Sequence, residues 1–373
     1  MAEKSFTEDI GGVRAVFTVL SGDTVGLGDS ESPAVPEDVR SFSVPGSVDH
    51  GGRGYTVVSV SDWAFRGCKQ LAHIDIPESV DSVGDCAFYG CAKLCEVGLP
   101  GIERVGDHMF CGCSSLGRVT VPASVREVDP GAFDGCTSLE SIDADPGNPV
   151  YSSSDGVLFT KDGSGLIRYP PGRPGDVYAV PEGTLSLGEE SFSDTVSLRT
   201  LHLPGSVEDI DTHALYRCPS LSRIETDGSG EFRSVDGVLF SSDGSTLIRY
   251  PPQREGTSYT VPEGTEYVGY WAFAGCEKLR NVEFGPGLVC VCDFAFAGCT
   301  SLEGIDIPKG TESLGWGAFN GCTSLEEVSL PKRVELQDDT FDHGFTDGKG
   351  RPARKAGGHS YRYDPGTSSD VPE

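Results

Sequence analysis

The sequence of 373 residues has little positive charge and no long apolar run. It contains 29 lysine and arginine residues against 57 aspartate and glutamate residues, which gives a formal net charge of −28. A protein this acidic repels nucleic acid and anionic lipid, so we expect no nucleic-acid partner. No stretch of about 18 apolar residues occurs, so we expect no membrane-spanning helix.

The composition also leaves little room for long helices or for general disorder. The 50 glycines and 24 prolines interrupt the chain too often for a helical bundle. The 18 phenylalanines and 12 tyrosines are enough to build a core. The first residues, MAEKSFTEDI, carry acidic side chains where a secretory signal would have basic and apolar regions, so we expect no export signal in this segment.

Motifs of catalysis and of metal binding are missing too. The sequence has no GxSxG, no P-loop and no HExxH, and its seven histidines are scattered without a serine, cysteine and carboxylate in a known catalytic order. The thirteen cysteines include no CxxC pair and no clustered histidines that would complete a zinc site. We therefore expect a protein that is not an enzyme and that needs no metal or cofactor.

What the sequence does contain is a repeat. The segment AFRGCKQL at Ala64 returns in nine copies, with a partial tenth at Phe341. In the clearest copies the aromatic residue recurs at steps of 22 or 23 residues, at Phe65, Phe88, Phe110 and Phe133, and again at Phe273, Phe296 and Phe319. A period of this length predicts a solenoid, because one such unit cannot bury its own apolar face and must stack on its neighbours.

Each repeat predicts a tight helical turn followed by a short strand. In the first full copy, apolar residues occur at Phe65, Cys68 and Leu71 and then alternate at Ile74 and Ile76. Spacing by three indicates the turn, and strict alternation indicates the strand. Pro77 ends the strand, since proline cannot donate to a sheet ladder.

The pattern IPESVDSVGDCAFYGCAKLCEV resembles the BspA-like leucine-rich repeat, over about residues 55–345. The resemblance implies a mostly β repeat solenoid of the α/β type, with a period of about 23 residues and a parallel sheet on its concave side. It also implies a protein-binding role at a bacterial cell surface, in adhesion or in interaction with host proteins. It is a resemblance of fold and repeat, and says little about the ligand.

Two stretches break the period and copy each other. DGVLFTKDGSGLIRYPP at Asp155 matches DGVLFSSDGSTLIRYPP at Asp236, 81 residues further on. Each predicts two apolar strands around a turn at Asp162 or Asp243. We expect β-hairpin inserts at about 145–180 and 227–262 that project from one edge of the solenoid.

The two ends of the chain differ from the repeats. Residues 1–54 contain strand-like runs such as VRAVFTVL and predict an N-terminal β cap over the open end of the stack. Residues 346–373 are rich in glycine, proline and charge and predict a disordered tail. The solenoid is therefore assigned to residues 55–345.

Eight of the thirteen cysteines share one repeat position, which favours a packing role over metal binding. They are Cys68, Cys91, Cys113, Cys136, Cys218, Cys276, Cys299 and Cys322. Unpaired thiols without framework spacing are compatible with a reducing compartment. If the eight repeat cysteines are core residues, they should react slowly with thiol reagents in the native protein.

The candidate binding residues are acidic side chains that the strand alternation points outward. They are Asp75, Glu96, Asp143, Glu225, Glu283, Asp306 and Glu327. Two interpretations remain: a merely solvated sheet, or an acidic concave face for a basic protein partner. The location is also open between a cell-surface protein and an intracellular scaffold, and we expect a monomer.

Overall fold

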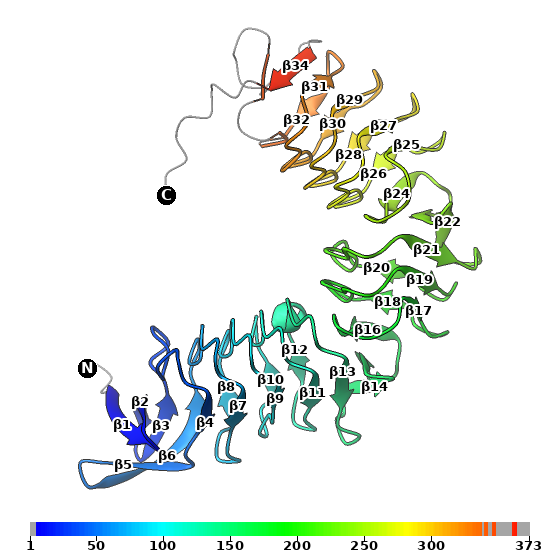
Figure 1. The fold of residues 1–373 in the computed structure, drawn as a ribbon. Coiled ribbons are helices and arrows are strands. Elements are labelled where there is room, and N and C mark those ends of the chain that lie inside the picture. Colours follow the sequence, from blue (N-terminus) through cyan, green and yellow to red (C-terminus); the bar gives the residue numbers. More distant parts are fainter. Residues whose placement is uncertain (1–4, 338, 342–344, 348–359, 364–373) are drawn as a thin grey trace. The chain divides into compact units, whose positions relative to one another are not determined.

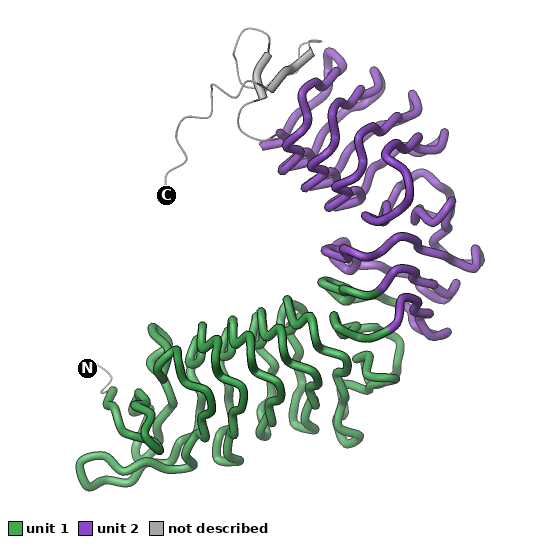
Figure 2. The backbone as a smooth tube through the Cα atoms, in the orientation of Figure 1, with its two compact units in different colours: residues 1–174, 186–197 green, residues 175–185, 198–373 purple. Residues whose placement is uncertain are grey.

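The computed structural model describes residues 5–337, 339–341, 345–347 and 360–363 (Figure 1). Among these residues, the only helix is the short 3-10 helix η1 (Pro130–Phe133). The chain forms two compact units, of which unit 1 comprises residues 1–174 and 186–197 and unit 2 comprises residues 175–185 and 198–373 (Figure 2). Within each unit, stacked coils contribute strands to two series, which we call the face strands and the edge strands.

The face strands come from the alternating segment of each repeat. In unit 1 they are β4 (Ser41–Ser43), β7 (His73–Asp75), β9 (Glu96–Val97), β11 (Arg118–Val121) and β13 (Ser141–Ala144). In unit 2 they are β17 (Val177–Ala179), β19 (Thr200–Leu203), β21 (Arg223–Thr226), β25 (Ser258–Thr260), β27 (Asn281–Glu283), β29 (Gly304–Asp306) and β31 (Glu327–Ser329). The pairs β4–β7–β9, β11–β13, β17–β19–β21 and β25–β27–β29–β31 are all parallel, which confirms the predicted parallel sheet.

The edge strands are short and follow the proline that ends each face strand. Unit 1 contains β8 (Ser82–Val83), β10 (Arg104–Val105), β12 (Glu127–Val128) and β18 (Ser186–Leu187). Unit 2 contains β20 (Asp209–Ile210), β26 (Tyr267–Val268), β28 (Cys290–Val291), β30 (Ser313–Leu314) and β32 (Glu335–Leu336). The pairs β10–β12 and β26–β28–β30–β32 are parallel.

Between an edge strand and the next face strand the chain makes the AFxGC turn. This turn closes without a regular helix in most coils, because glycines such as Gly67 and Gly90, both at φ +73°, leave the right-handed helical region. The aromatic residues of successive turns stack in the core, with ring centroids 5.4 Å apart for Phe65–Phe88 and 4.6 Å apart for Phe273–Phe296. Offset ring stacking adds to the apolar area that each coil buries against the next.

The eight repeat cysteines are all buried, which confirms their assignment to the core. They also make a contact that the sequence does not reveal. The thiol of Cys91 donates to the carbonyl oxygen of Phe65 at 3.1 Å, and the thiol of Cys299 donates to that of Phe273 at 3.2 Å. Six of the eight cysteines make this contact to the aromatic residue of the preceding coil, whereas the thiols of Cys68 and Cys218 donate to the carbonyls of Pro36 and Tyr216.

The N-terminal segment is a sheet that continues into the solenoid. β1 (Ser5–Ile10), β2 (Val13–Ser21) and β3 (Thr24–Leu27) pair antiparallel, and β3 pairs parallel with β6 (Arg53–Val60). β6 pairs antiparallel with β5 (Ser47–His50) and parallel with β8, so it acts as the first edge strand. Since β4 already pairs with β7, the parallel ladder begins at Ser41 rather than after residue 54.

Each insert is a three-stranded meander. The first consists of β14 (Tyr151–Ser154), β15 (Val157–Thr160) and β16 (Gly165–Arg168), and the second of β22 (Phe232–Val235), β23 (Val238–Ser241) and β24 (Thr246–Arg249). Successive strands of each meander pair antiparallel, so the predicted hairpins are present. The last strand of each also pairs parallel with an edge strand, β16 with β18 and β24 with β26.

The expectation that the hairpins project from the solenoid as appendages is wrong. Tyr169 stacks on Phe192 at 5.3 Å, and Tyr250 stacks on Phe273 at 5.0 Å. Both tyrosines are almost fully buried and occupy the aromatic position of a regular turn. The insert is therefore built into the stack, because its last strand and its tyrosine form an additional coil that buries apolar surface like the others.

The C-terminal segment that was predicted to be disordered contains two strands, β33 (Phe345–Asp347) and β34 (Ser360–Tyr363). They pair antiparallel with each other, and β34 pairs antiparallel with β31. β31 is the last face strand, and a free strand edge offers unpaired N–H and C=O groups to another strand. The prediction for residues 348–359 and 364–373 lies outside the described residues.

Candidate functional site

The seven predicted acidic residues lie on face strands of both units. Asp75, Glu96 and Asp143 belong to unit 1, and the other four, Glu225, Glu283, Asp306 and Glu327, belong to unit 2. None of the seven is buried, because the strand alternation directs the residue between each outward pair into the core. The outward orientation predicted from the sequence is therefore confirmed for all seven.

Four of the seven do not join a common site. Asp75 accepts a hydrogen bond from the hydroxyl of Ser43 at 3.0 Å, and Glu225 is paired with Arg223 on its own strand. Asp143 accepts from the Ser141 hydroxyl at 2.5 Å, and Glu96 does not line the depression formed by the other three. Glu225 does not adjoin Glu283, because the additional coil of the second insert adds the face strand β25 before β27, and Thr260 of β25 lies opposite Glu283.

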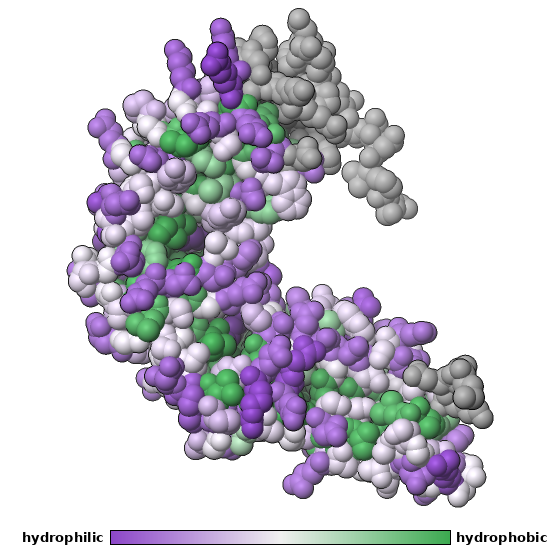
Figure 3. Space-filling model, turned by 180° about the vertical axis from the view of Figure 1, so that it is seen from behind, coloured by the Kyte–Doolittle hydropathy of each residue, from purple (hydrophilic) through white to green (hydrophobic). Residues whose placement is uncertain are grey.

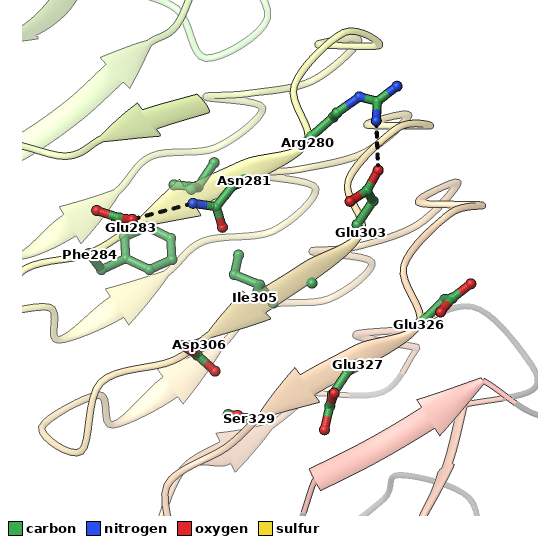
Figure 4. Close-up of a pocket in the computed structure, with 12 residues that line it drawn as sticks. Arg280, Asn281, Glu283, Phe284, Glu303, Ile305, Asp306, Glu326, Glu327 and Ser329 are labelled. Atoms are coloured by element: carbon green, nitrogen blue, oxygen red, sulfur yellow. Dashed lines mark hydrogen bonds and ion pairs between the residues drawn. The ribbon is translucent and has the colours of Figure 1, made fainter. Parts of the chain in front are cut away.

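The other three, Glu283, Asp306 and Glu327, line one open depression of about 1370 Å³ across β27, β29 and β31 (Figure 4). Three more charged residues line it, Glu303 and Glu326, which precede β29 and β31, and Arg280, which precedes β27. The depression thus holds five carboxylates and one guanidinium. We call it the acidic depression.

Buried apolar residues hold the carboxylates of the acidic depression in place. Val282, Ile305 and Val328 lie at the centres of β27, β29 and β31 and are at most 3% exposed. The register pairs Asn281 with Gly304 and Gly304 with Glu327, so the outward positions of the three strands form columns. Neighbouring strands are about 4.8 Å apart. At that spacing two exposed carboxylates repel by about 1 kcal/mol in water, which a solvated face tolerates.

Two carboxylates of the acidic depression have a polar partner. The Arg280 guanidinium lies 3.0 Å from a Glu303 carboxylate oxygen, and both side chains are more than half exposed. The hydroxyl of Thr260 donates to Glu283 at 3.2 Å. Among the residues whose side chains the structure describes, Asp306, Glu326 and Glu327 form no ion pair, so their carboxylates are available to a cationic partner.

Glu303, Glu326 and Arg280 were missed by the sequence reasoning. Strict alternation selects only the two outward positions of each strand, and these three residues directly precede the strand. A repeat position marks them, because each directly follows the core leucine that recurs in the repeats, at Leu279, Leu302 and Leu325. A long side chain at that position can reach across to the face.

Besides the acidic depression, one pair of interacting thiols lies in the described part of the chain. Within it, no group of three or more histidine, cysteine, aspartate or glutamate side chains is arranged to hold a metal ion. Cys290 and Cys292 lie on either side of the buried Val291, and a hydrogen bond between the two thiols lowers the pKa of Cys290 to about 6. A lowered pKa favours the thiolate form of Cys290, which is the nucleophilic form of a cysteine.

The surface is mainly hydrophilic. Hydrophilic side chains cover much of the face seen in Figure 3, with smaller hydrophobic areas between them. The large exposed hydrophobic residues are Leu20, Tyr89, Val177, Leu185, Val196, Tyr267, Tyr270 and Trp316. Within the described residues, no helix has the length and apolar character needed to cross a bilayer.

The chain matches the BspA type leucine rich repeat region in six copies, over residues 54–152, 178–253 and 253–344. Two solved structures share its fold. A leucine-rich cell surface protein from Faecalibacterium prausnitzii is 24% identical, with a TM-score of 0.50 over 88% of this chain and 90% of that chain. A leucine-rich repeat protein from Eubacterium ventriosum is 18% identical, with a TM-score of 0.51 over 90% of this chain and 99% of that chain. Among curated proteins, no sequence matches the chain.

Proposed function

Because the chain belongs to the BspA-type leucine-rich repeat family, whose members are typically binding proteins rather than enzymes, we propose that its acidic depression binds a basic segment of a protein partner. The observation that carries this proposal is the gathering of Glu283, Asp306 and Glu327 with Glu303 and Glu326 in one depression. Lysine and arginine side chains are the protein groups that pair with such a cluster.

The shape of the depression favours a protein segment over a small molecule. It is open to solvent, crosses three strands and is lined mainly by charged side chains, whereas small-molecule pockets are enclosed and mostly apolar. An extended chain lying across the strands would place several basic side chains near successive carboxylates. The half-buried Phe284, which also lines the depression, would contact the stem of such a side chain.

The pairing of β34 with β31 supports an extended occupant beside this site. The register places Arg362 opposite Glu327 on β31. The last face strand therefore accepts an antiparallel strand along its edge, which is how many extended peptides are recognised.

We further propose that the protein acts at a bacterial cell surface, in adhesion to host proteins or to proteins of neighbouring cells. This finer assignment is an inference by analogy with the family and with the leucine-rich cell surface protein from Faecalibacterium prausnitzii. Fractionation of the native cells tests it: the protein is expected in washed surface fractions, and its recovery from the cytosol alone would favour an intracellular scaffold.

The binding role is tested by removing charge without changing shape. In the triple variant Glu283→Gln, Asp306→Asn, Glu327→Gln, association with a short lysine-rich peptide is expected to slow about tenfold at low salt, because charge mainly accelerates encounter. The matched control is Asp75→Asn, Glu96→Gln, Asp143→Asn, which removes the same charge from face strands of unit 1.

The measurement is stopped-flow or surface-plasmon-resonance kinetics over a series of salt concentrations. The control triple should bind the peptide at nearly the unaltered rate, and the rate for the unaltered protein should fall steeply as salt screens the charges. Equal rates for the two triple variants would show that only the total charge matters and that the acidic depression is a solvated surface.

A further inference from the structure

The two inserts are copies in sequence, but one difference between them and one between the coils that precede them change the polar contacts beside the edge strands. The offset of 81 residues pairs Tyr151 of β14 with Phe232 of β22, and Arg168 of β16 with Arg249 of β24. The coil that precedes each insert aligns as AFDGC at Ala132 and ALYRC at Ala214, so Asp134 corresponds to Tyr216.

In unit 1 a tyrosine hydroxyl closes the open side of the edge strand β12. The N–H of Val128 donates to the Tyr151 hydroxyl oxygen at 3.0 Å, and that hydroxyl donates to the carbonyl of Arg126 at 3.4 Å. Tyr151 is 7% exposed. The hydroxyl thus satisfies backbone groups that the meander leaves unpaired.

In unit 2 the equivalent residue has no hydroxyl, and a pocket of about 190 Å³ lies there. Phe232 lines it together with Ile210, the counterpart of Val128 on the edge strand β20. Its other walls are formed by Asp211, Thr212, Leu215, Thr246, Ile248, Arg249, Gly269, Tyr270 and Trp271. The pocket is therefore mostly apolar, with one buried cation in its wall.

That cation has fewer partners than its twin. Arg168 donates to the carbonyls of Pro130, Glu190 and Ser193 and forms a salt bridge of 3.0 Å with Asp134, and both of these side chains are buried. Among the described residues, Arg249 donates only to the carbonyls of Trp271 and Ala274. No carboxylate of the described residues lies within salt-bridge distance of it, although it is only 3% exposed.

A buried guanidinium without a counter-ion is costly, and its remaining N–H groups are strong donors for an anion. Arg249 lacks the two contacts that Arg168 makes to Pro130 and Asp134. In unit 2, Thr212 stands at the position of Pro130, and Tyr216 stands at the position of Asp134. Thr212 and Leu215, the residue before Tyr216, both line the pocket. The pocket thus lies beside the positions that supply these partners in unit 1.

We propose that this pocket binds a small monocarboxylate with a compact apolar body. The carboxylate accepts hydrogen bonds from Arg249, and the apolar part packs against Phe232, Ile248 and Trp271. The volume admits one ring or one branched aliphatic group rather than a larger ligand. Asp211 in the wall repels a second negative charge, so the ligand carries only one.

Phenylacetate is the probe for the experiment, and the full chain is the protein. Trp271 lies in the pocket wall, so its fluorescence reports binding, and ligand-observed NMR provides an independent readout. We expect saturable binding of phenylacetate that is at least about tenfold tighter than that of the neutral 2-phenylethanol, as a charge-assisted hydrogen bond requires. Phenylmalonate, which adds a second carboxylate, should bind more weakly than phenylacetate.

Three variants connect the binding to the pocket. Phe232→Tyr restores the hydroxyl of unit 1, and Tyr216→Asp supplies the internal carboxylate, so each should abolish phenylacetate binding. Tyr151→Phe is the matched control in unit 1 and should leave binding unchanged, because Arg168 keeps Asp134. Circular dichroism verifies that each variant is folded, and the single added hydroxyl of Phe232→Tyr keeps the test available if Tyr216→Asp fails to fold.

The proposal is overturned by any of three results. The first is no saturable binding of phenylacetate, and the second is equal affinity for 2-phenylethanol, which would show an apolar cavity without a role for Arg249. The third is unaltered binding in folded Phe232→Tyr, which would place the ligand elsewhere. None of these results depends on the acidic depression, whose test uses a different face and a cationic probe.

Discussion

The two insert coils show which parts of a repeat are fixed and which are free to change. Both keep the meander, a buried arginine and the tyrosine that stacks on the next aromatic residue. They differ in the partners of the arginine and in one hydroxyl: Asp134 and Tyr151 in unit 1 become Tyr216 and Phe232 in unit 2. Apolar stacking therefore preserves the coil, while a change of two polar groups opens a pocket in one copy.

The largest effect should come from removing an insert, since both inserts are parts of the stack. Deletion of residues 155–171 removes Arg168 and Tyr169 and exposes the apolar face of the neighbouring coil. We expect cooperative unfolding of unit 1 to be lost, and the equivalent deletion of residues 236–252 should do the same in unit 2.

Thermal unfolding followed by circular dichroism measures the effect. Inserting a few glycines at the exposed turn of Asp162 and Gly163 is the control, and it should cost less than about 1 kcal/mol because loop closure depends weakly on length. If the deletion variants unfolded as cooperatively as the unaltered chain, the inserts would be appendages after all.

A smaller effect is expected from breaking the ion pair that only unit 1 has. Asp134→Leu leaves Arg168 buried without a carboxylate and should lower the free energy of unfolding by about 3 to 5 kcal/mol. The second change Arg168→Leu should recover part of this loss, since it removes the unpaired charge. Tyr216→Leu, at the corresponding position of unit 2, should cost clearly less, and urea unfolding compares the three.

If Asp134→Leu and Tyr216→Leu lowered the free energy of unfolding equally, the ion pair would contribute nothing to stability beyond packing. The two coils would then not differ in electrostatic stabilisation.

The smallest effect should come from exchanging the hydroxyl between the two copies. Tyr151→Phe leaves the N–H of Val128 without its partner and should cost about 1 to 3 kcal/mol. Phe232→Tyr makes the reverse change and should be neutral or stabilising by up to about 1 kcal/mol. Differential scanning calorimetry of both variants measures the pair, and a destabilised Phe232→Tyr would show that the two meanders pack differently.

Much of the fold could be predicted because its signal repeats. The aromatic, cysteine and leucine positions of each turn recur at a fixed step, and the structure stacks them as expected. The place of the inserts could also have been predicted, since Tyr169 lies 23 residues before Phe192 and Tyr250 lies 23 residues before Phe273. At these two tyrosines the hairpin pattern obscures the period of the repeat.

The sites were less predictable because they depend on contacts between coils. The alternation identified Glu283, Asp306 and Glu327 as outward residues but could not show that Glu303 and Glu326 reach the same depression. The pocket near Arg249 depends on whether residue 232 carries a hydroxyl that meets an edge strand more than twenty residues away. No local pattern reports such a pairing.

The cysteine ladder has a consequence for the redox environment in which the protein can work. Burial raises the pKa of Cys68 and of Cys136 to about 12, and it raises the pKa of Cys113, Cys276 and others as well. At neutral pH only about one molecule in 10⁵ carries a thiolate at a group with that pKa. Since the thiolate is the species that exchanges with disulfides and reacts with oxidants, these thiols persist reduced while their coils stay folded, even in oxidising surroundings. The buried cysteines of the repeat are therefore no sign of a reducing compartment.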